Sequence, residues 1–225
     1  MSVRRLIIAI DGPSGAGKGT VAREIARRLH YRHLDTGAMY RAVAWKALHD
    51  AIALENEDAL ADLAQRVSLD VGPSSVVIDG HDVTNAIRTP EIDRAAAAAA
   101  RLPKVRAALV ERQRHEGASG GIVMEGRDIG SVVFPNADVK IYLDASPEER
   151  ARRRAADPAH GISRAAAAAD VATEMAARDQ SDRTRSTSPL KKTEGAIALD
   201  TTGLSIEETV QKVLAIVNDA LSAPR

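Results

Sequence analysis

The chain has 225 residues, 44% of them hydrophobic and 28% charged, which is enough to bury the core of one soluble domain. Its 31 basic and 31 acidic side chains balance, and only 2% of residues are aromatic, so a nucleic acid held by overall charge or base stacking is not expected as a partner. The absence of cysteine excludes disulfides and thiolate catalysis.

The first apolar run, residues 6–10, stops at Asp11 and is too short for a signal peptide. No stretch reaches the roughly 18 apolar residues of a membrane span. We therefore expect a cytoplasmic protein that has no membrane partner. The run itself predicts a buried parallel strand, because it is continuously apolar and ends in Asp-Gly.

A glycine-rich loop, GPSGAGKGT, joins this strand to apolar residues at helical spacing between Val21 and Leu29. Glycines there can aim several backbone N–H groups at one anion, and the helix start adds its dipole. The alternative is a tight turn that is glycine-rich for structural reasons alone. We predict ATP binding by Gly12, Pro13, Ser14, Gly15, Ala16, Gly17, Lys18, Gly19 and Thr20.

Two residues of this loop have particular roles in the prediction. Lys18 can reach the β- and γ-phosphates, which makes it a candidate catalytic residue. Gly19 follows it where the general P-loop pattern has serine or threonine. Thr20 supplies the hydroxyl one position later, and we predict that it is a ligand of Mg²⁺.

The next stretch, LDTGAMYR at residues 34–41, contains a hydrogen-bonding Thr36 and, one helical turn beyond Gly37, an Arg41 suited to phosphate. It is equally typical of a helix capped by Asp35 or Thr36, with Arg41 on the surface. Further along, residues 67–84 contain short β-branched runs separated by turns, which predicts a small antiparallel insert. The alanine-rich residues 95–100 favour a helix.

An apolar run at residues 122–124 precedes EGRDIGSVVFP, residues 125–135. Arg127 and Asp128 thus follow a strand, at the sheet edge where ligands bind in α/β folds. Arg127 can hold phosphate while Asp128 hydrogen-bonds an amino or hydroxyl group. A local ion pair between the two neighbours is the alternative.

Another apolar run, residues 139–143, precedes the basic run RARRR at residues 150–154 and a loop with Pro158 and Gly161. That loop can close over a triphosphate. In RDQSDRTRS, spacings of four and seven residues place Arg178, Asp182 and Arg185 on one helical face. For both stretches, a salt-bridged solvent-exposed face is the alternative. A last apolar run lies at residues 196–199.

Strands alternating with helices predict an α/β fold with a parallel sheet. Several arginines and few candidate bases surround the phosphate loop. This composition suits the transfer of a phosphoryl group from one phosphate to another. The acceptor phosphate is already an anion at pH 7 and needs no base, and catalysis consists mostly of positioning and of charge stabilisation by cations.

These motifs, together with VKIYLDAS, occur in an order that resembles bacterial cytidylate kinases over nearly the whole chain. The resemblance implies phosphorylation of CMP and dCMP by ATP in the cytoplasm. It also implies one P-loop kinase domain over residues 1–225, with a five-stranded parallel central sheet, a monophosphate-binding insert at about 55–102 and a lid at about 150–163. We expect a monomer.

The resemblance also implies roles for individual side chains. Arg127, Arg185 and Arg153 join Lys18 as catalytic candidates. The implied acceptor site has phosphate contacts from Arg41, Arg127 and Arg185, base contacts from Arg106 and Asp128, ribose contacts from Arg178 and Asp182, and Thr36 and Tyr40 as further lining residues.

The chain departs from the family pattern at two positions. Ala97 stands where a serine that helps to read the base is expected, which predicts weaker discrimination of cytosine from uracil. Glu125 stands where an aspartate is expected before Gly-Arg-Asp.

Three other functions are compatible with parts of the pattern. One is a P-loop kinase that acts on another small acceptor. The face formed by Arg178, Asp182 and Arg185 favours a nucleotide over an alcohol as that acceptor. Another is a nucleotide-operated switch, although a guanine-reading Asn-Lys-x-Asp run is absent. The third is a nucleic-acid binder, which the zero net charge and scarce aromatics disfavour.

Overall fold

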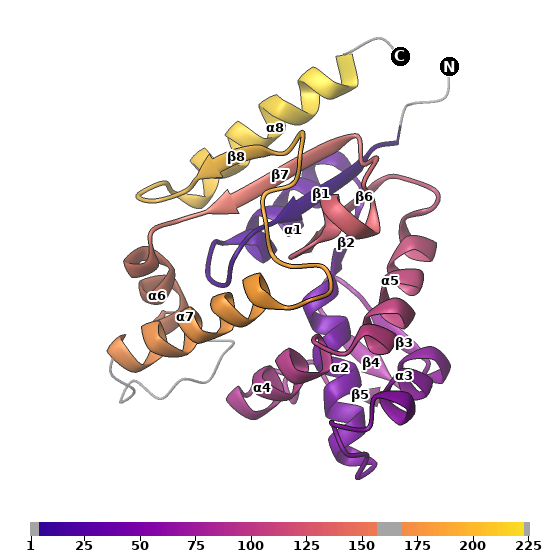
Figure 1. The fold of residues 1–225 in the computed structure, drawn as a ribbon. Helices are drawn as coiled ribbons and strands as arrows, with labels where there is room; N and C mark the ends of the chain where they lie inside the picture. The colour runs from indigo at the N-terminus through magenta and orange to yellow at the C-terminus, as the bar shows by residue number, and fades with distance from the viewer. Residues whose placement is uncertain (1–4, 157–167, 223–225) are drawn as a thin grey trace.

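The computed structural model describes residues 5–156 and 168–222. Figure 1 shows a central sheet flanked by helices, with a smaller lobe below it built from the middle of the chain. No helix within the described ranges is both long and apolar enough to cross a membrane. The predicted lid at about 150–163 is described only as far as residue 156, so its remainder lies outside the described residues.

The central sheet has five strands, all parallel, in the order β2-β6-β1-β7-β8. The strands are β1 (Ile7–Asp11), β2 (Arg32–Asp35), β6 (Ile122–Gly126), β7 (Val139–Asp144) and β8 (Ile197–Asp200). Four of them match the apolar runs of the sequence. The parallel α/β fold is thus confirmed, and β1 lies at the centre because both faces of its apolar run are buried.

Helices cover both faces of this sheet, as Figure 1 shows. Ile8 and Ile10 of β1 pack on one face with α1 (Lys18–Leu29) and α8 (Ile206–Ser222). Ala9 belongs to the core of the other face. That second core is built from α2 (Thr36–His49), α3 (Glu57–Arg66) and α5 (Pro103–Gly117), together with residues of β6.

The middle of the chain forms the smaller lobe. A three-stranded antiparallel sheet, ordered β3-β4-β5, lies within the stretch where the sequence predicted it, which confirms that prediction. Its strands are β3 (Leu69–Val71), β4 (Val76–Ile78) and β5 (His81–Asp82). The helix α4 (Pro90–Ala99) follows, capped by the Thr89 side chain, and it includes most of the alanine run. We call α3, β3–β5 and α4 the insert.

Two helices follow β7 on the other side of the cavity described below. They are α6 (Pro147–Ala155), whose N-cap is Ser146, and α7 (Ala168–Thr184). Figure 1 shows them side by side, with α4 below them. A short π-helical turn, η1 (Ile129–Val133), follows β6 and directs residues 127 and 128 toward the space between α4 and α7.

Candidate active site

A cavity of about 750 Å³ opens at the carboxyl ends of the central strands, bordered by α4, α6 and α7. This is the edge where parallel α/β sheets bind ligands. The predicted site residues that line it are Ser14, Gly15, Ala16, Gly17, Lys18, Gly19, Thr20, Thr36, Tyr40, Arg41, Arg106, Arg127, Asp128, Arg153, Arg178, Asp182 and Arg185. Gly12 and Pro13, the first two residues of the loop, are buried and do not line the cavity.

The glycine loop leaves β1 in a conformation that only glycine allows at its first position. Gly12 has φ +151°, and a Cβ there would lie 2.0 Å from the backbone oxygen of Leu143 on β7. Farther along, the Ser14 N–H donates to Asp179, and the Ser14 carbonyl accepts from Arg150 at 3.1 Å. Arg150 and Asp179 also pair with each other, so α6 and α7 hold the loop from behind.

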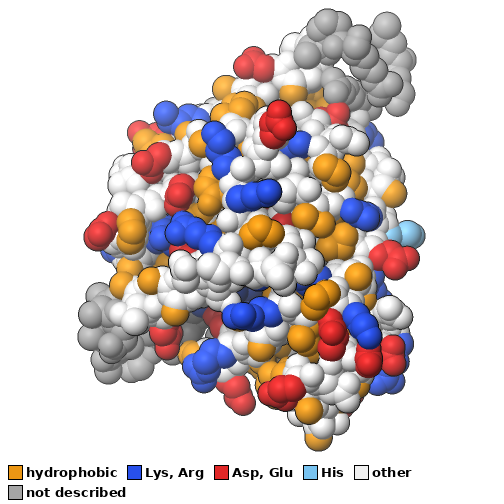
Figure 2. All heavy atoms as spheres, in the orientation of Figure 1, with side chains coloured by type: hydrophobic (Ala, Val, Ile, Leu, Met, Phe, Trp, Pro, Cys, Tyr) orange, Lys and Arg blue, Asp and Glu red, His pale blue; other side chains and the backbone are white. Residues whose placement is uncertain are grey.

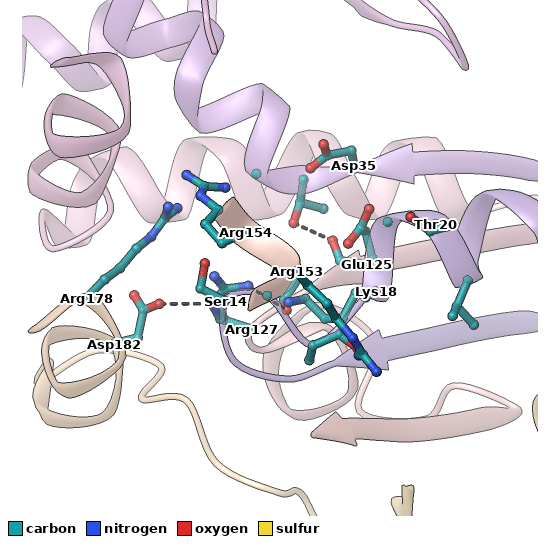
Figure 3. Close-up of a pocket in the computed structure, with 18 of the residues that line it drawn as sticks. Ser14, Lys18, Thr20, Asp35, Glu125, Arg127, Arg153, Arg154, Arg178 and Asp182 are labelled. Atoms are coloured by element: carbon teal, nitrogen blue, oxygen red, sulfur yellow. Dashed lines mark hydrogen bonds and ion pairs between the residues drawn. The ribbon is translucent and has the colours of Figure 1, made fainter. Parts of the chain in front are cut away.

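Lys18 is buried at the start of α1, and its Nζ donates to the Pro13 carbonyl at 2.7 Å. Burial, followed by the positive charge of Arg127, lowers the pKa of Lys18 to about 7. An anion in the loop would reverse this effect, because a negative charge nearby favours the ammonium form. Figure 3 shows Lys18 beside Arg127 and Arg153 in the floor of the cavity.

The structure gives a steric reason for glycine, and not serine or threonine, at position 19. A Cβ at this position would lie 2.9 Å from Oε1 of Glu125, so a serine or threonine would have to displace that carboxylate. Glu125 is the penultimate residue of the buried strand β6, and its Oε1 lies 3.4 Å from Nε2 of His33 on β2. The hydroxyl at Thr20 and the Glu125 carboxylate both line the cavity (Figure 3). The longer acid at position 125 thus occupies the space that the missing side chain at position 19 leaves.

In the stretch at residues 34–41, the helix cap that the sequence predicted is present, and two further side chains line the cavity. Asp35 is the N-cap of α2, accepting from the Ala38 N–H at 2.9 Å, and its other oxygen holds Arg41 at 2.9 Å. Thr36 lines the cavity and donates to the Glu125 carbonyl at 2.7 Å. Arg41 also lines the cavity and is not a free surface residue.

Arg127 does not pair with its neighbour Asp128. Its Nε lies 2.9 Å from Oδ2 of Asp182 on α7 (Figure 3). Burial opposes the charged form of Arg127, but Asp182, together with Asp179 and Glu125, raises the pKa of Arg127. The alternative of a local ion pair between positions 127 and 128 is therefore wrong.

Asp128 instead joins two other arginines in a buried cluster. Its carboxylate pairs with Arg106 of α5 and lies 3.7 Å from Nη2 of Arg185. The Arg106 guanidinium lies 5.8 Å from the ring centre of Tyr40. Burial raises the pKa of Tyr40 to about 12, so its hydroxyl stays protonated at neutral pH. The cluster thus presents guanidinium donors, a carboxylate acceptor and a neutral hydroxyl to one wall of the cavity.

The arginine-rich face predicted at residues 178–185 lies against the cavity and not against solvent. The helix α7 ends at Thr184, so Arg185 lies one residue beyond it, where its Nε donates to the Ser188 carbonyl at 2.6 Å. Burial, followed by the charge of Arg127, lowers the pKa of Arg178. The lowered pKa indicates that several cations lie close together on this wall of the cavity, where a bound anion would stabilise their charged forms.

The basic run at residues 150–154 divides into different environments. Arg150 is buried behind the glycine loop, as described above, and Arg152 pairs with Glu149 near the surface. Arg153 donates to the hydroxyl and carbonyl of Thr201 at 2.9 and 2.7 Å, beside the loop. Arg154 reaches across to Asp93 of α4. Of these arginines, Arg152, Arg153 and Arg154 line the cavity.

Several charged residues that line the cavity were not assigned a role from sequence. Arg88, in the turn before α4, donates to the Thr84 carbonyl at 3.1 Å and faces the cavity. The others are Arg23, Asp35, Glu125, Glu149, Arg152 and Arg154. Arg88 lacks a distinctive neighbouring motif. Arg154 belongs to the basic run at residues 150–154, and Asp35 to the stretch LDTGAMYR, where the sequence predicts a helix cap.

These features together define a class of protein. A glycine loop with a buried lysine opens a helix, and arginines from seven separate segments line the same cavity. Such a site can hold two phosphate-bearing molecules and stabilise charge on a phosphoryl group that passes between them. The fold and site are therefore those of a P-loop phosphotransferase.

Comparison with known proteins identifies the family. The family model described as cytidylate kinase matches residues 8–219. The cytidylate kinase of Desulfitobacterium hafniense (strain Y51) is 50% identical over 219 residues, covering 96% of this chain and 94% of the relative. That of Geobacillus sp. (strain WCH70) is 49% identical over 222 residues, covering 95% and 97%. The chain belongs to the cytidylate kinase family.

Solved structures agree on the fold. A crystal structure of an uncharacterized protein from Eubacterium ventriosum ATCC 27560 is similar with a TM-score of 0.55 at 10% identity. The similarity covers 96% of this chain and 99% of that one. At this level of identity it supports the fold alone.

Proposed function

We propose how the cavity carries out the reaction that family membership assigns to the chain. The chain phosphorylates CMP and dCMP to CDP and dCDP, with ATP as the phosphoryl donor. The observation that carries the assignment is about 50% sequence identity to cytidylate kinases over nearly the whole chain. The cavity supports it, because it contains both the glycine loop and a second cationic wall.

The donor triphosphate is assigned to the glycine loop. The backbone N–H groups of residues 14–20 and the dipole of α1 offer hydrogen bonds and positive potential to its oxygens. Lys18 would exchange its bond to the Pro13 carbonyl for the β- and γ-phosphates. Arg153, held at Thr201 beside the loop, adds charge on the donor side.

A divalent cation fits the same end of the cavity. The Thr20 hydroxyl and the Glu125 carboxylate both line this wall, and oxygen ligands are those that Mg²⁺ prefers. Bound there with the phosphates, Mg²⁺ would neutralise charge on the transferring group. Thr20 is the hydroxyl that we assign to the metal.

The acceptor nucleotide is assigned to the opposite wall. Its phosphate would lie among Arg41, Arg127 and Arg185, and its ribose hydroxyls at Arg178 and Asp182. Arg106 and Asp128 are assigned to the cytosine, whose exocyclic amine donates where uracil has an oxygen that only accepts. Thr36 and Tyr40 complete this wall.

The transfer itself needs no general base from the chain. The second pKa of a phosphate monoester is about 6, so the acceptor oxygen is already nucleophilic at neutral pH. The residues Lys18, Arg127, Arg153 and Arg185 would stabilise charge on the equatorial oxygens of the transferring phosphoryl group. We further infer a cytoplasmic monomer.

The experiment that tests the function measures ADP release from Mg-ATP with CMP, dCMP, UMP, AMP, GMP or no acceptor. Strong stimulation by CMP and dCMP, with little by the purine nucleotides, is the expected result. Stimulation by RNA and not by any monophosphate, or release that no acceptor alters, would contradict the assignment. The UMP rate reports on the Ala97 departure.

A further inference from the structure

Asp93 lies on α4 outside the cavity lining, yet it contacts two arginines that line the cavity. Its carboxylate pairs with Arg154 of α6, and its Oδ1 lies 3.5 Å from Nη1 of Arg178 on α7. The Asp93 side chain is only 13% exposed, and the two arginine side chains are 18% and 23% exposed. One carboxylate therefore joins three helices at the border of the active site.

The two arginines need a counter-charge in this position. Figure 3 shows the guanidinium groups of Arg154 and Arg178 directed toward the same part of the cavity. Burial and the neighbouring charge of Arg127 already disfavour the charged form of Arg178, and Asp93 acts in the opposite direction. Like charges repel strongly where water is partly excluded. Asp93 thus keeps the two guanidinium groups together on the cavity wall.

A second contact ties the same elements together. Arg101, just after α4, donates from Nη1 to the Ser181 hydroxyl of α7 at 3.3 Å. The insert is therefore joined to α7 from both ends of α4. This places the acceptor insert in a defined position relative to the helices that carry Arg154 and Arg178.

We propose that Asp93 is a positioning residue for phosphoryl transfer, which holds Arg154 and Arg178 against the cavity and ties the insert to α6 and α7. The inference rests on the proposed function and extends it, because neither Asp93 nor Arg154 has a role in the assignments above. Groups that act on a transition state must already be in place, since displacements of about 1 Å can lower a rate by a hundredfold.

A helix-stabilising role is the competing explanation. Asp93 belongs to the first turn of α4, where a carboxylate interacts favourably with the helix dipole. Glu91 belongs to the same turn and is exposed to solvent. Glu91→Gln therefore removes the same charge from the same helix end without touching the pair of arginines, and it is the matched control.

The kinetic test compares Asp93→Asn, Asp93→Glu and Glu91→Gln with the native chain. For Asp93→Asn we expect kcat to fall about tenfold while KM for CMP changes less than about threefold, because an interaction that acts on the transition state is lost. Asp93→Glu should restore kcat to within about threefold of native, and Glu91→Gln should stay within about twofold.

Two kinetic outcomes would overturn the proposal. One is a kcat within about twofold of native for Asp93→Asn. The other is a loss of kcat in Asp93→Glu as large as that in Asp93→Asn, together with an equal fall in the melting temperatures of these two variants. That result would mean that Asp93 contributes to stability alone. If the native chain itself shows no CMP-stimulated ADP release, it is the proposed function that fails.

A second measurement tests the tie without any turnover. The chain has no native cysteine, so Asp62→Cys on α3 and Glu174→Cys on α7, both exposed positions, accept a pair of spin labels at defined places. In the ligand-free chain we expect one narrow distance distribution, which broadens when Asp93→Asn is added and not when Glu91→Gln is added. An unchanged distribution would refute the tie between the insert and α7.

Discussion

Lys18 shows how burial and charge at one residue prepare the site for an anion. Its ammonium group has one carbonyl partner in the structure, at Pro13, and lies in a wall of arginines. A desolvated lysine among like charges gains much more from a bound triphosphate than an exposed lysine does. This residue is therefore where loss of a single charge should affect turnover most.

Lys18→Met should lower kcat at least about a hundredfold and leave the fold intact, because a preorganised charge that acts on the transferring phosphoryl group is removed. Steady-state ADP release with CMP measures the rate, and circular dichroism measures folding. Lys212→Met, at an exposed position on α8, is the matched control. A near-normal rate for Lys18→Met would refute the role of the loop.

ATP binding should take up a proton at pH 8. Above its pKa of about 7, Lys18 is mostly neutral in the free chain, and the triphosphate returns it to the ammonium form. By linkage, affinity for ATP should weaken as pH rises above 7, by up to about tenfold per unit. Calorimetry in buffers of different ionisation enthalpy measures the uptake, and Lys18→Met should abolish it. Uptake that persists in the variant would implicate another group.

Ala97→Ser should raise the preference for CMP over UMP. Ala97 lines the same cavity as Arg106 and Asp128, and a hydroxyl at this position is expected to hydrogen-bond the base. One such bond contributes about 0.5–1.5 kcal/mol, which is roughly a two- to twelvefold change in the ratio of kcat/KM values. The exposed Ala98→Ser on the same helix should leave the ratio unchanged. An unchanged ratio in Ala97→Ser would exclude this position from the base-binding wall.

At the scale of elements, the main connection is between β1 and the turn after β6. Asp11 ends β1, and its two carboxylate oxygens accept the N–H groups of Ile129 and Gly130, each at 2.8 Å. Burial raises the pKa of Asp11 to about 6 in spite of these bonds. The end of one strand thereby holds the segment that carries Arg127 and Asp128.

Asp11→Ala should destabilise the chain by about 2–6 kcal/mol, because it leaves two buried N–H groups without acceptors at about 1–3 kcal/mol each. Urea unfolding measures the free energy. Asp219→Ala on the exposed side of α8 should change it by less than about 0.5 kcal/mol. If Asp11→Ala lowers the free energy of unfolding as little as Asp219→Ala does, solvent or another group satisfies the N–H groups of Ile129 and Gly130.

Element prediction succeeded where local pattern and burial agree. The strands β1, β6, β7 and β8 are apolar runs that end in an acid or a glycine. The strand β2 was missed as a separate element because it reads Arg-His-Leu-Asp and lies at the sheet edge, where only Leu34 is buried. A short edge strand can be stable with a single buried residue. A search for continuous runs of apolar residues does not detect such a strand.

At the scale of the whole molecule, the cavity is lined by parts of the chain from the glycine loop to the first turn of α8. A ligand that binds only this assembled state stabilises it by about 2.7 kcal/mol at a hundred times its dissociation constant. For a chain of this length, that corresponds to a rise in melting temperature of about 5–10 °C.

CMP and an unreactive ATP analogue should each raise the melting temperature by this amount, and differential scanning fluorimetry measures it. In Lys18→Met the rise with the ATP analogue should shrink while the rise with CMP persists, because the two nucleotides occupy different walls of the cavity. A loss of both rises together would contradict the separation of donor and acceptor sites.

The sequence by itself determined the parallel α/β class, the glycine loop and which arginines and aspartates to examine, because these depend on local periodicity and on motifs within short stretches. Only the tertiary structure decided the partners: Asp128 pairs with Arg106 and Arg185, Arg127 with Asp182, and Asp93 with Arg154 and Arg178. Charge pairs between distant segments depend on how helices pack around the sheet, and spacing along the chain carries no information about that.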